Sequence, residues 1–317
     1  MAIYQVAAIR ADGPAAIIDA HHHFWDLRRF RYPWLAGDGT GSPQVKLPAS
    51  YLRSSFRDDG EGLAIAGSVV IEAGQEDAAA EAAWLGGCAA ESGPLTGVVG
   101  RVRLEADDAA AQLAALAAVV RVRGVRQVLN VRRSAGGPSY GASRPDLIDD
   151  PGWRRGLALV QDAGLTFDLQ VEPSQLAQAA RLAADFGGIT FILDHGGYMT
   201  RREADTDRQW RAGIRALARA ANVAVKACDY STVDPGFDSQ GFTDFVHELL
   251  EVFGPDRTLF ASNFPGEGLT ISYRRLAEEF DRALAILTAA ERGAVWAGNA
   301  TRIYRLGDLA PDFAAAV

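Results

Sequence analysis

The stretch IIDAHHH, residues 17–23, indicates the fold class of this chain. An apolar, β-branched run leads directly into three histidines, which is typical of a strand that ends at a polar site. Side chains in a strand alternate between two faces, so Ile17, Asp19, His21 and His23 are expected to share one face. Two imidazoles at the end of one face could hold one metal ion or one substrate oxygen.

Seven more short apolar runs follow, and helical patterns separate them. We predict these further strands at 66–74, 95–104, 122–130, 166–172, 189–197, 222–230 and 258–265. Strands that alternate with helices imply a parallel sheet with crossover helices. Eight such units favour a closed (β/α)₈ TIM barrel. An open doubly wound sheet is the alternative, but no glycine-rich phosphate loop follows the first strand.

The composition limits the classes of partner. The 317 residues carry 32 basic and 40 acidic side chains, a formal net charge of −8. This acidity argues against nucleic acid or an anionic membrane as a main partner, but it says nothing firm about the substrate, which we expect to be a small molecule. No apolar run is long enough to span a membrane, and no signal peptide is predicted. The two cysteines indicate no disulfide framework, which suggests a reducing, cytoplasmic setting. The sequence does not decide whether the protein forms a homodimer.

The barrel is expected to form one domain. We predict an N-terminal extension over 1–16, a single catalytic barrel over 17–306 and a C-terminal tail over 307–317. The long stretches 26–64 and 131–151 are expected to be pocket loops that set specificity.

Active sites of such barrels lie at the carboxyl ends of the strands. His195 lies near the end of the run 189–197, where alternation places it on one face with Leu193 and turns Asp194 away as a structural residue. His22 and His247 are interpreted as structural. A buried core histidine is the plain alternative for His195, but three histidines at predicted lumen ends favour a site.

Other polar residues near strand ends are candidates for binding a substrate. A rim salt bridge or hydrogen bond is the alternative for each of them. An arginine inside a barrel suits a substrate carboxylate. Trp25 in the first long loop either walls the pocket or anchors the loop. The candidates for substrate binding are Trp25, Glu72, Arg126, Gln170, Glu172 and Lys226.

Four motifs resemble one family. The segments IIDAHHHFWDLRRFRYPWL, LDHGG, ASNFPGEGLTISY and VWAGNATRIYRL are similar to those of the amidohydrolase-related lactonases, which include sugar-lactone hydrolases and 2-pyrone-4,6-dicarboxylate lactonase. The resemblance spans Ile17 to Leu306. It implies an amidohydrolase-like barrel that opens a lactone with an activated water. It maps the catalytic histidines to His21, His23 and His195, which hold zinc in some members and work without metal in others.

One position departs from that family. Its eighth strand usually ends in Ser-Asp-Trp-Pro, where the aspartate is the base or a metal ligand, whereas this chain has Ser262-Asn263-Phe264-Pro265. An asparagine cannot accept a proton from water. We therefore expect Asn263 to orient the water, while a histidine, Glu72 or Glu172 acts as the base.

Three functions remain open on this sequence. The first is a lactone hydrolase with one divalent metal, zinc or manganese, on His21, His23 and His195, or with metal-free catalysis. The second is a non-hydrolytic enzyme on the same barrel, such as a decarboxylase, dehydratase, isomerase or cyclase, which Asn263 makes more credible. The third is a non-catalytic binding protein.

Overall fold

The computed structural model describes residues 14, 16–35, 47–93, 95–130, 144, 146–199, 204–233 and 236–307. The predicted extension 1–16 and tail 307–317 lie almost wholly outside the described residues. Most of the predicted loop 131–151 and part of the loop 26–64 lie outside them as well.

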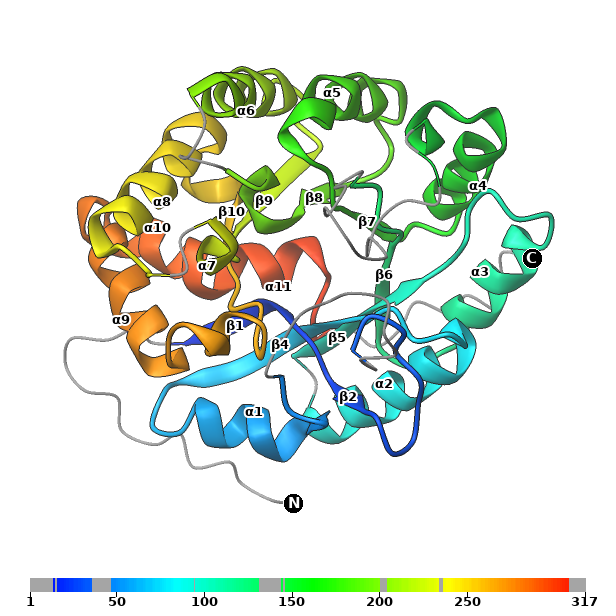
Figure 1. Ribbon diagram of the computed structural model, residues 1–317, viewed down its shortest axis with the longest axis horizontal. Helices are drawn as coiled ribbons and strands as arrows, with labels where there is room; N and C mark the ends of the chain where they lie inside the picture. The colour runs from blue at the N-terminus through cyan, green and yellow to red at the C-terminus, as the bar shows by residue number, and fades with distance from the viewer. Residues whose placement is uncertain are drawn as a thin grey trace.

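Eight parallel strands form one sheet in which each strand pairs with its neighbours along the chain (Figure 1). The sheet closes because the end of the first strand meets the segment after the last. Here the Asn263 N–H donates to the His21 carbonyl oxygen at 2.7 Å, and the His23 N–H donates to the Phe264 carbonyl oxygen at 2.8 Å. The predicted (β/α)₈ barrel is confirmed. Its strands are β1 (Ile17–His22), β4 (Ile65–Ile71), β5 (Thr96–Arg101), β6 (Val122–Arg126), β7 (Thr166–Leu169), β8 (Phe191–Leu193), β9 (Val223–Ala227) and β10 (Thr258–Phe260).

Helices surround the sheet on its outer side (Figure 1). A short antiparallel pair, β2 (Trp25–Asp26) with β3 (Ser50–Tyr51), lies in the first loop. The α-helices are α1 (Arg53–Asp59), α2 (Ala78–Ser92), α3 (Ala109–Ala117), α4 (Pro151–Asp162), α5 (Leu176–Asp185), α6 (Ala204–Leu217), α7 (Tyr230–Val233), α8 (Ser239–Phe253), α9 (Tyr273–Ala283), α10 (Ala289–Gly293) and α11 (Asn299–Ile303). Within the described residues, no helix is both long and apolar enough to cross a membrane.

Two apolar clusters make the core. The larger one joins the outer faces of the strands to the helices. The smaller one fills the lumen with alternate strand residues, including Ile18, Val69, Ile192 and Leu259, and Tyr304 after α11 also belongs to it. Side chains that fill the inside of the barrel leave room for polar chemistry only near its ends.

The prediction that Ile17 and Asp19 share the lumen face of the first strand with His21 is wrong. Ile18 and Ala20 pack in the lumen cluster, whereas Ile17 belongs to the outer one. Asp19 accepts hydrogen bonds from the Ser262 hydroxyl at 2.6 Å and from the Tyr273 hydroxyl at 2.9 Å, and Tyr273 lies on the outer helix α9. The pairing of β1 with β4 shifts register between Asp19 and His22. Such an irregularity reverses the alternation of side chains beyond it.

Candidate active site

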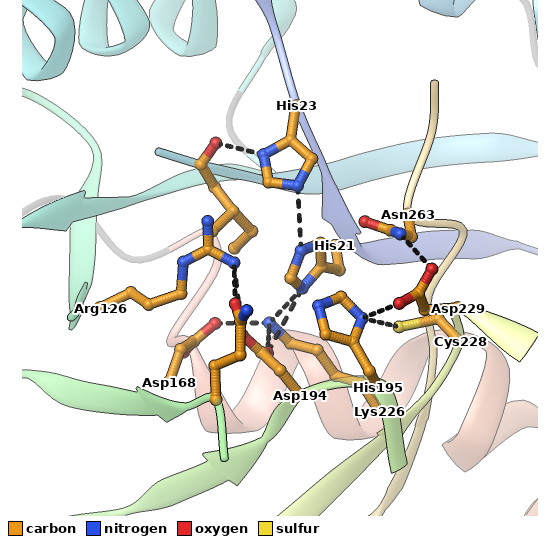
Figure 2. Close-up of polar contacts among 12 residues, drawn as sticks. His21, His23, Arg126, Asp168, Asp194, His195, Lys226, Cys228, Asp229 and Asn263 are labelled. Carbon is orange, nitrogen blue, oxygen red and sulfur yellow. Dashed lines mark hydrogen bonds and ion pairs between the residues drawn. The ribbon is translucent and has the colours of Figure 1, made fainter. Parts of the chain in front are cut away.

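Three imidazoles meet at the carboxyl end of the barrel (Figure 2). The Nε2 atoms of His21 and His23 lie 3.2 Å apart. The ring centroid of His195 lies 4.8 Å from that of His21. His22 lies outside this group and stacks on Phe56 of α1, with ring centroids 4.0 Å apart. The register shift in β1 therefore places the first and third histidines of the run inward and the middle one outward.

His195 reaches the site through a turn and not along a strand face. Strand β8 ends at Leu193, and residues Asp194–Gly197 form a short 3₁₀ turn in which His195 has φ 57°. This left-handed backbone is uncommon outside glycine. The expectation that Asp194 points away is wrong, since Ile192 and Asp194 lie on the lumen side and the turn then brings His195 in as well.

Asp194, Lys226 and Asp168 form a buried ion network beneath the imidazoles. The Lys226 ammonium lies 2.9 Å from Asp194 Oδ1 and also contacts Asp168 and, at 3.1 Å, His21 Nδ1. Burial would raise the pKa of Asp194, but Lys226 and His21 hold it well below its usual range. Burial lowers the pKa of Lys226, and the two carboxylates more than offset this. Lys226 is therefore a charged group that holds His21 and Asp194 in place.

Arg126 and Glu72 form a second buried pair. The Arg126 Nε–H donates to Glu72 Oε1 at 2.7 Å, one terminal nitrogen donates to the Glu72 carbonyl oxygen at 2.6 Å, and the other donates to Gln170 Oε1 at 3.0 Å. Burial raises the pKa of Glu72, but Arg126 and Arg101 bring it below its usual value. The guanidinium expected to meet a substrate carboxylate thus already holds one from the protein itself.

Two predicted substrate residues, Trp25 and Glu172, make hydrogen bonds within the protein. The Trp25 indole N–H donates to the Pro48 carbonyl oxygen at 2.8 Å, which ties the first loop down. Glu172 precedes the turn η2 (Pro173–Gln175), and its N–H donates to the Gln175 side chain at 3.0 Å. The Trp25 contact matches the loop-anchoring alternative, whereas the Glu172 contact is made by its backbone. Their predicted roles in binding a substrate stay predictions.

The end of β9 supplies two residues that the sequence interpretation missed. Cys228 Sγ lies 3.4 Å from His195 Nδ1, and Asp229 Oδ2 lies 3.9 Å from the same atom. Asn263 donates its side-chain amide to Asp229 Oδ1 at 2.9 Å. Lys226 was a signal for Cys228, because the residue two positions beyond a lumen-facing lysine also faces the lumen. Asp229 has no such signal, since a left-handed turn with φ 63° brings it in.

The residues fit a divalent metal ion at the His21–His23 pair. His23 Nδ1 lies 3.0 Å from the Ile71 carbonyl oxygen, which only accepts, so Nδ1 carries the proton and Nε2 presents its lone pair. Burial lowers the pKa of His23 to about 4, which keeps the ring neutral. Two imidazole nitrogens bound to one tetrahedral ion would lie about 3.3 Å apart. The separation observed between the Nε2 atoms is close to that value.

Two other groups of candidate ligand atoms lie nearby. His21, His195 and Cys228 form one, and His21, Asp168 and Asp194 form the other. The second already surrounds the Lys226 ammonium, so a cation is disfavoured there. The first adds a thiol to two of the histidines, and a thiolate is a ligand that zinc favours.

Comparison with known proteins identifies the family. Residues 18–306 match the Amidohydrolase family. The chain belongs to the amidohydrolase family. It is 30% identical to an L-fucono-1,5-lactonase of Burkholderia multivorans over 91% of this chain and 96% of that protein. An uncharacterized protein of Sinorhizobium fredii is 31% identical over 92% of this chain and 99% of its own length.

A solved structure supports the same assignment. A crystal structure of an amidohydrolase from Burkholderia multivorans with bound zinc covers 92% of this amidohydrolase and 100% of that chain, with a TM-score of 0.79 and 29% identity. Barrels of this kind place their chemistry at the carboxyl ends of the strands. The imidazole cluster of this amidohydrolase lies at that end.

Proposed function

We propose that this amidohydrolase opens a lactone of a sugar acid or of a pyrone-type carboxylate by attack of a water molecule. The observation that carries the proposal is the convergence of His21, His23 and His195 at the mouth of the barrel. It occurs in a chain that resembles an L-fucono-1,5-lactonase over nearly its whole length. Residues 17–306 would form the single catalytic domain, acting on a small molecule in the cytoplasm.

We infer that His21 and His23 would hold one zinc or manganese ion, with His195 completing the set. Bound there, the ion would polarise the lactone carbonyl and bind water as a Lewis acid. The protein prepares these ligands through their other ring nitrogens. The Ile71 carbonyl fixes His23. Asp194 Oδ1, 3.3 Å from His21 Nδ1, would accept the proton of that nitrogen when Nε2 binds the ion. Such outer partners set the tautomer and direction of a metal-binding imidazole.

The reaction itself needs few changes of bonding. Water oxygen adds to the carbonyl carbon, the bond from that carbon to the ring oxygen breaks, and the ring oxygen takes up a proton. The developing negative charge on the carbonyl oxygen requires a positive environment. His195 would act here as a neutral ligand of the ion, since burial lowers its pKa to about 3 and keeps the ring unprotonated.

The two alternatives have weaker support. A non-hydrolytic reaction was suggested by the loss of the strand-end aspartate at Asn263. The structure places the Asp229 carboxylate against that asparagine, so the mouth of the barrel still holds a carboxylate. A binding protein without activity would not need the buried charges beneath the histidines, which are costly to bury.

A panel of sugar lactones and pyrone carboxylates tests the proposal. Wild type should open at least one of them, and His195→Ala should lower kcat/KM by about 10²- to 10⁴-fold. His247→Gln is the matched control, because His247 lies on α8 and contacts the Ala283 carbonyl. No turnover of any lactone by zinc- or manganese-loaded wild type would overturn the proposal.

A further inference from the structure

Asn263 is held so that its side chain faces Asp229 (Figure 2). Its N–H donates to the His21 carbonyl oxygen at 2.7 Å, and its own carbonyl oxygen accepts from the Glu267 N–H at 3.2 Å. Its amide nitrogen then donates to Asp229 Oδ1 at 2.9 Å. The side-chain oxygen of an amide cannot take a proton from water, whereas the carboxylate beside it can.

Three consecutive strand ends share an unusual backbone. His195 after β8, Asp229 after β9 and Asn263 after β10 have φ of 57°, 63° and 54°. The left-handed region is uncommon for residues other than glycine, although asparagine and aspartate adopt it more readily than most. Residues in such conformations cluster at functional sites, where the surrounding structure imposes them. Here the turns bring an imidazole, a carboxylate and an amide into one group.

Three of the carboxylates near the imidazoles are engaged by cations. Asp168 and Asp194 contact Lys226, and Glu72 is paired with Arg126. A carboxylate that compensates a buried cation is a poor proton acceptor. Asp229 is also the most accessible of the four, at 9% exposure against 1% or less for the others. A water molecule that enters the mouth of the barrel can therefore reach Asp229.

The turns that carry Asp229 and Asn263 are tied together. Glu267 in η5 (Glu267–Leu269) accepts from the Ser231 N–H at 3.0 Å and from the Ser231 hydroxyl at 2.9 Å. Ser231 lies two residues after Asp229 in α7. The two strand ends are thus fixed relative to each other by a contact outside the site.

We propose that Asp229 is the carboxylate that binds the attacking water and accepts its proton, while Asn263 holds Asp229 and orients the same water. This inference rests on the proposed lactone hydrolysis. The water oxygen forms the new bond to the carbonyl carbon as its proton passes to Asp229. The ring oxygen leaves with the electron pair of the broken carbon–oxygen bond and receives that proton.

An exchange of the two side chains tests the pair. Asp229→Asn should lower kcat on the lactone opened by wild type about 100-fold or more, with a smaller change in KM. The double variant Asp229→Asn with Asn263→Asp should have a kcat at least about tenfold higher than that of Asp229→Asn. It restores one carboxylate and one amide across the same contact. A merely structural Asp229 would instead lower the melting temperature of Asp229→Asn and leave the kcat of the folded variant unchanged.

The backbone at positions 229 and 263 accepts either of the two side chains. Asparagine and aspartate both tolerate the left-handed region, so neither exchange strains the turn. Asp229→Gly serves as a second variant that fits the same φ, and melting temperatures check the folding of all variants. Glu279→Gln is the matched control, since Glu279 is a buried carboxylate on α9 that contacts Ser239 and Arg282, and its kcat should equal wild type.

The outcomes separate the two proposals. A wild-type enzyme that opens a lactone, with Asp229→Asn and Asp229→Gly equally active, overturns this inference and leaves the lactonase function intact. A double variant whose kcat is no higher than that of folded Asp229→Asn overturns the proposal that the two side chains act as a pair. A wild-type enzyme that opens no lactone overturns the proposed function, and this inference with it.

Discussion

Lys226 Nζ lies 2.9 Å from Asp194 Oδ1, with both side chains fully buried at the centre of the barrel. The same ammonium contacts Asp168, whose carboxylate also accepts from the Tyr304 hydroxyl at 2.9 Å. Burial raises the pKa of Asp168 to about 6, although Lys226 opposes this. In the lumen, therefore, two carboxylates share the Lys226 ammonium. The imidazole of His21 contacts the same ammonium.

Lys226→Met should destabilise the fold by about 3–5 kcal/mol at pH 7, because it leaves buried carboxylates without their cation. Urea unfolding of wild type and variant measures the difference. Adding Asp168→Asn to Lys226→Met should return part of the lost stability, since one uncompensated charge disappears. Equal unfolding free energies for wild type and Lys226→Met would contradict the role of Lys226.

His23→Ala should lower the affinity for zinc or manganese at least about 100-fold, since it removes one of the two ligands that face each other. Metal analysis of untagged protein after dialysis against graded chelator measures this. His22→Phe is the comparison variant, because His22 stacks on Phe56 outside the site. Equal metal content in His23→Ala and wild type at every chelator concentration would refute a metal site at this pair.

Arg126→Met should lower stability by about 3 kcal/mol, because Glu72 then becomes a buried charge without its partner. The variant Glu72→Gln with Arg126→Met should be less destabilised than the sum of the single changes, with a coupling energy of about 1–3 kcal/mol. A double-mutant cycle by urea unfolding gives this number. Additive effects would show that the two side chains act independently, and a substrate role for Arg126 would regain support.

The sequence predicted the eight strands because each is a short β-branched run beside a longer helical pattern. It also named the histidines that meet at the site, but for a wrong geometric reason. Strict alternation placed Ile17 and Leu193 in the lumen, whereas both pack outward. His21 and His195 enter the site because a register shift in β1 and a left-handed turn after β8 change the direction of the chain.

Those two irregularities have no reliable local signal in a single sequence. A bulge depends on how two strands pair, which sequence periodicity does not reveal. A left-handed non-glycine residue is imposed by its surroundings. For the same reason Asp229 and Asp194 were missed as partners of Asn263 and His21. Contacts between distant strand ends could be inferred only once the barrel was closed.

The buried ring of His22 makes the fold sensitive to acid. Neither of its nitrogens has a hydrogen-bond partner among the described residues, and burial lowers its pKa to about 3. In the unfolded chain His22 has the ordinary histidine pKa near 6.5. Between pH 6.5 and 3 the unfolded chain therefore binds a proton on His22 that the folded state does not bind. Stability from the neutral ring is present above pH 6.5 and is lost as the pH falls toward 3.

His22→Phe should remove this loss. Phenylalanine keeps the stack on Phe56 and buries no unpaired nitrogen, so stability at pH 7 should stay equal or rise by about 1 kcal/mol. Between pH 6.5 and 4.5 wild type should lose about 2 kcal/mol more than the variant, since one proton contributes about 1.4 kcal/mol per pH unit. Urea unfolding across this range measures both curves. Parallel curves would mean that His22 takes up a proton without unfolding the chain.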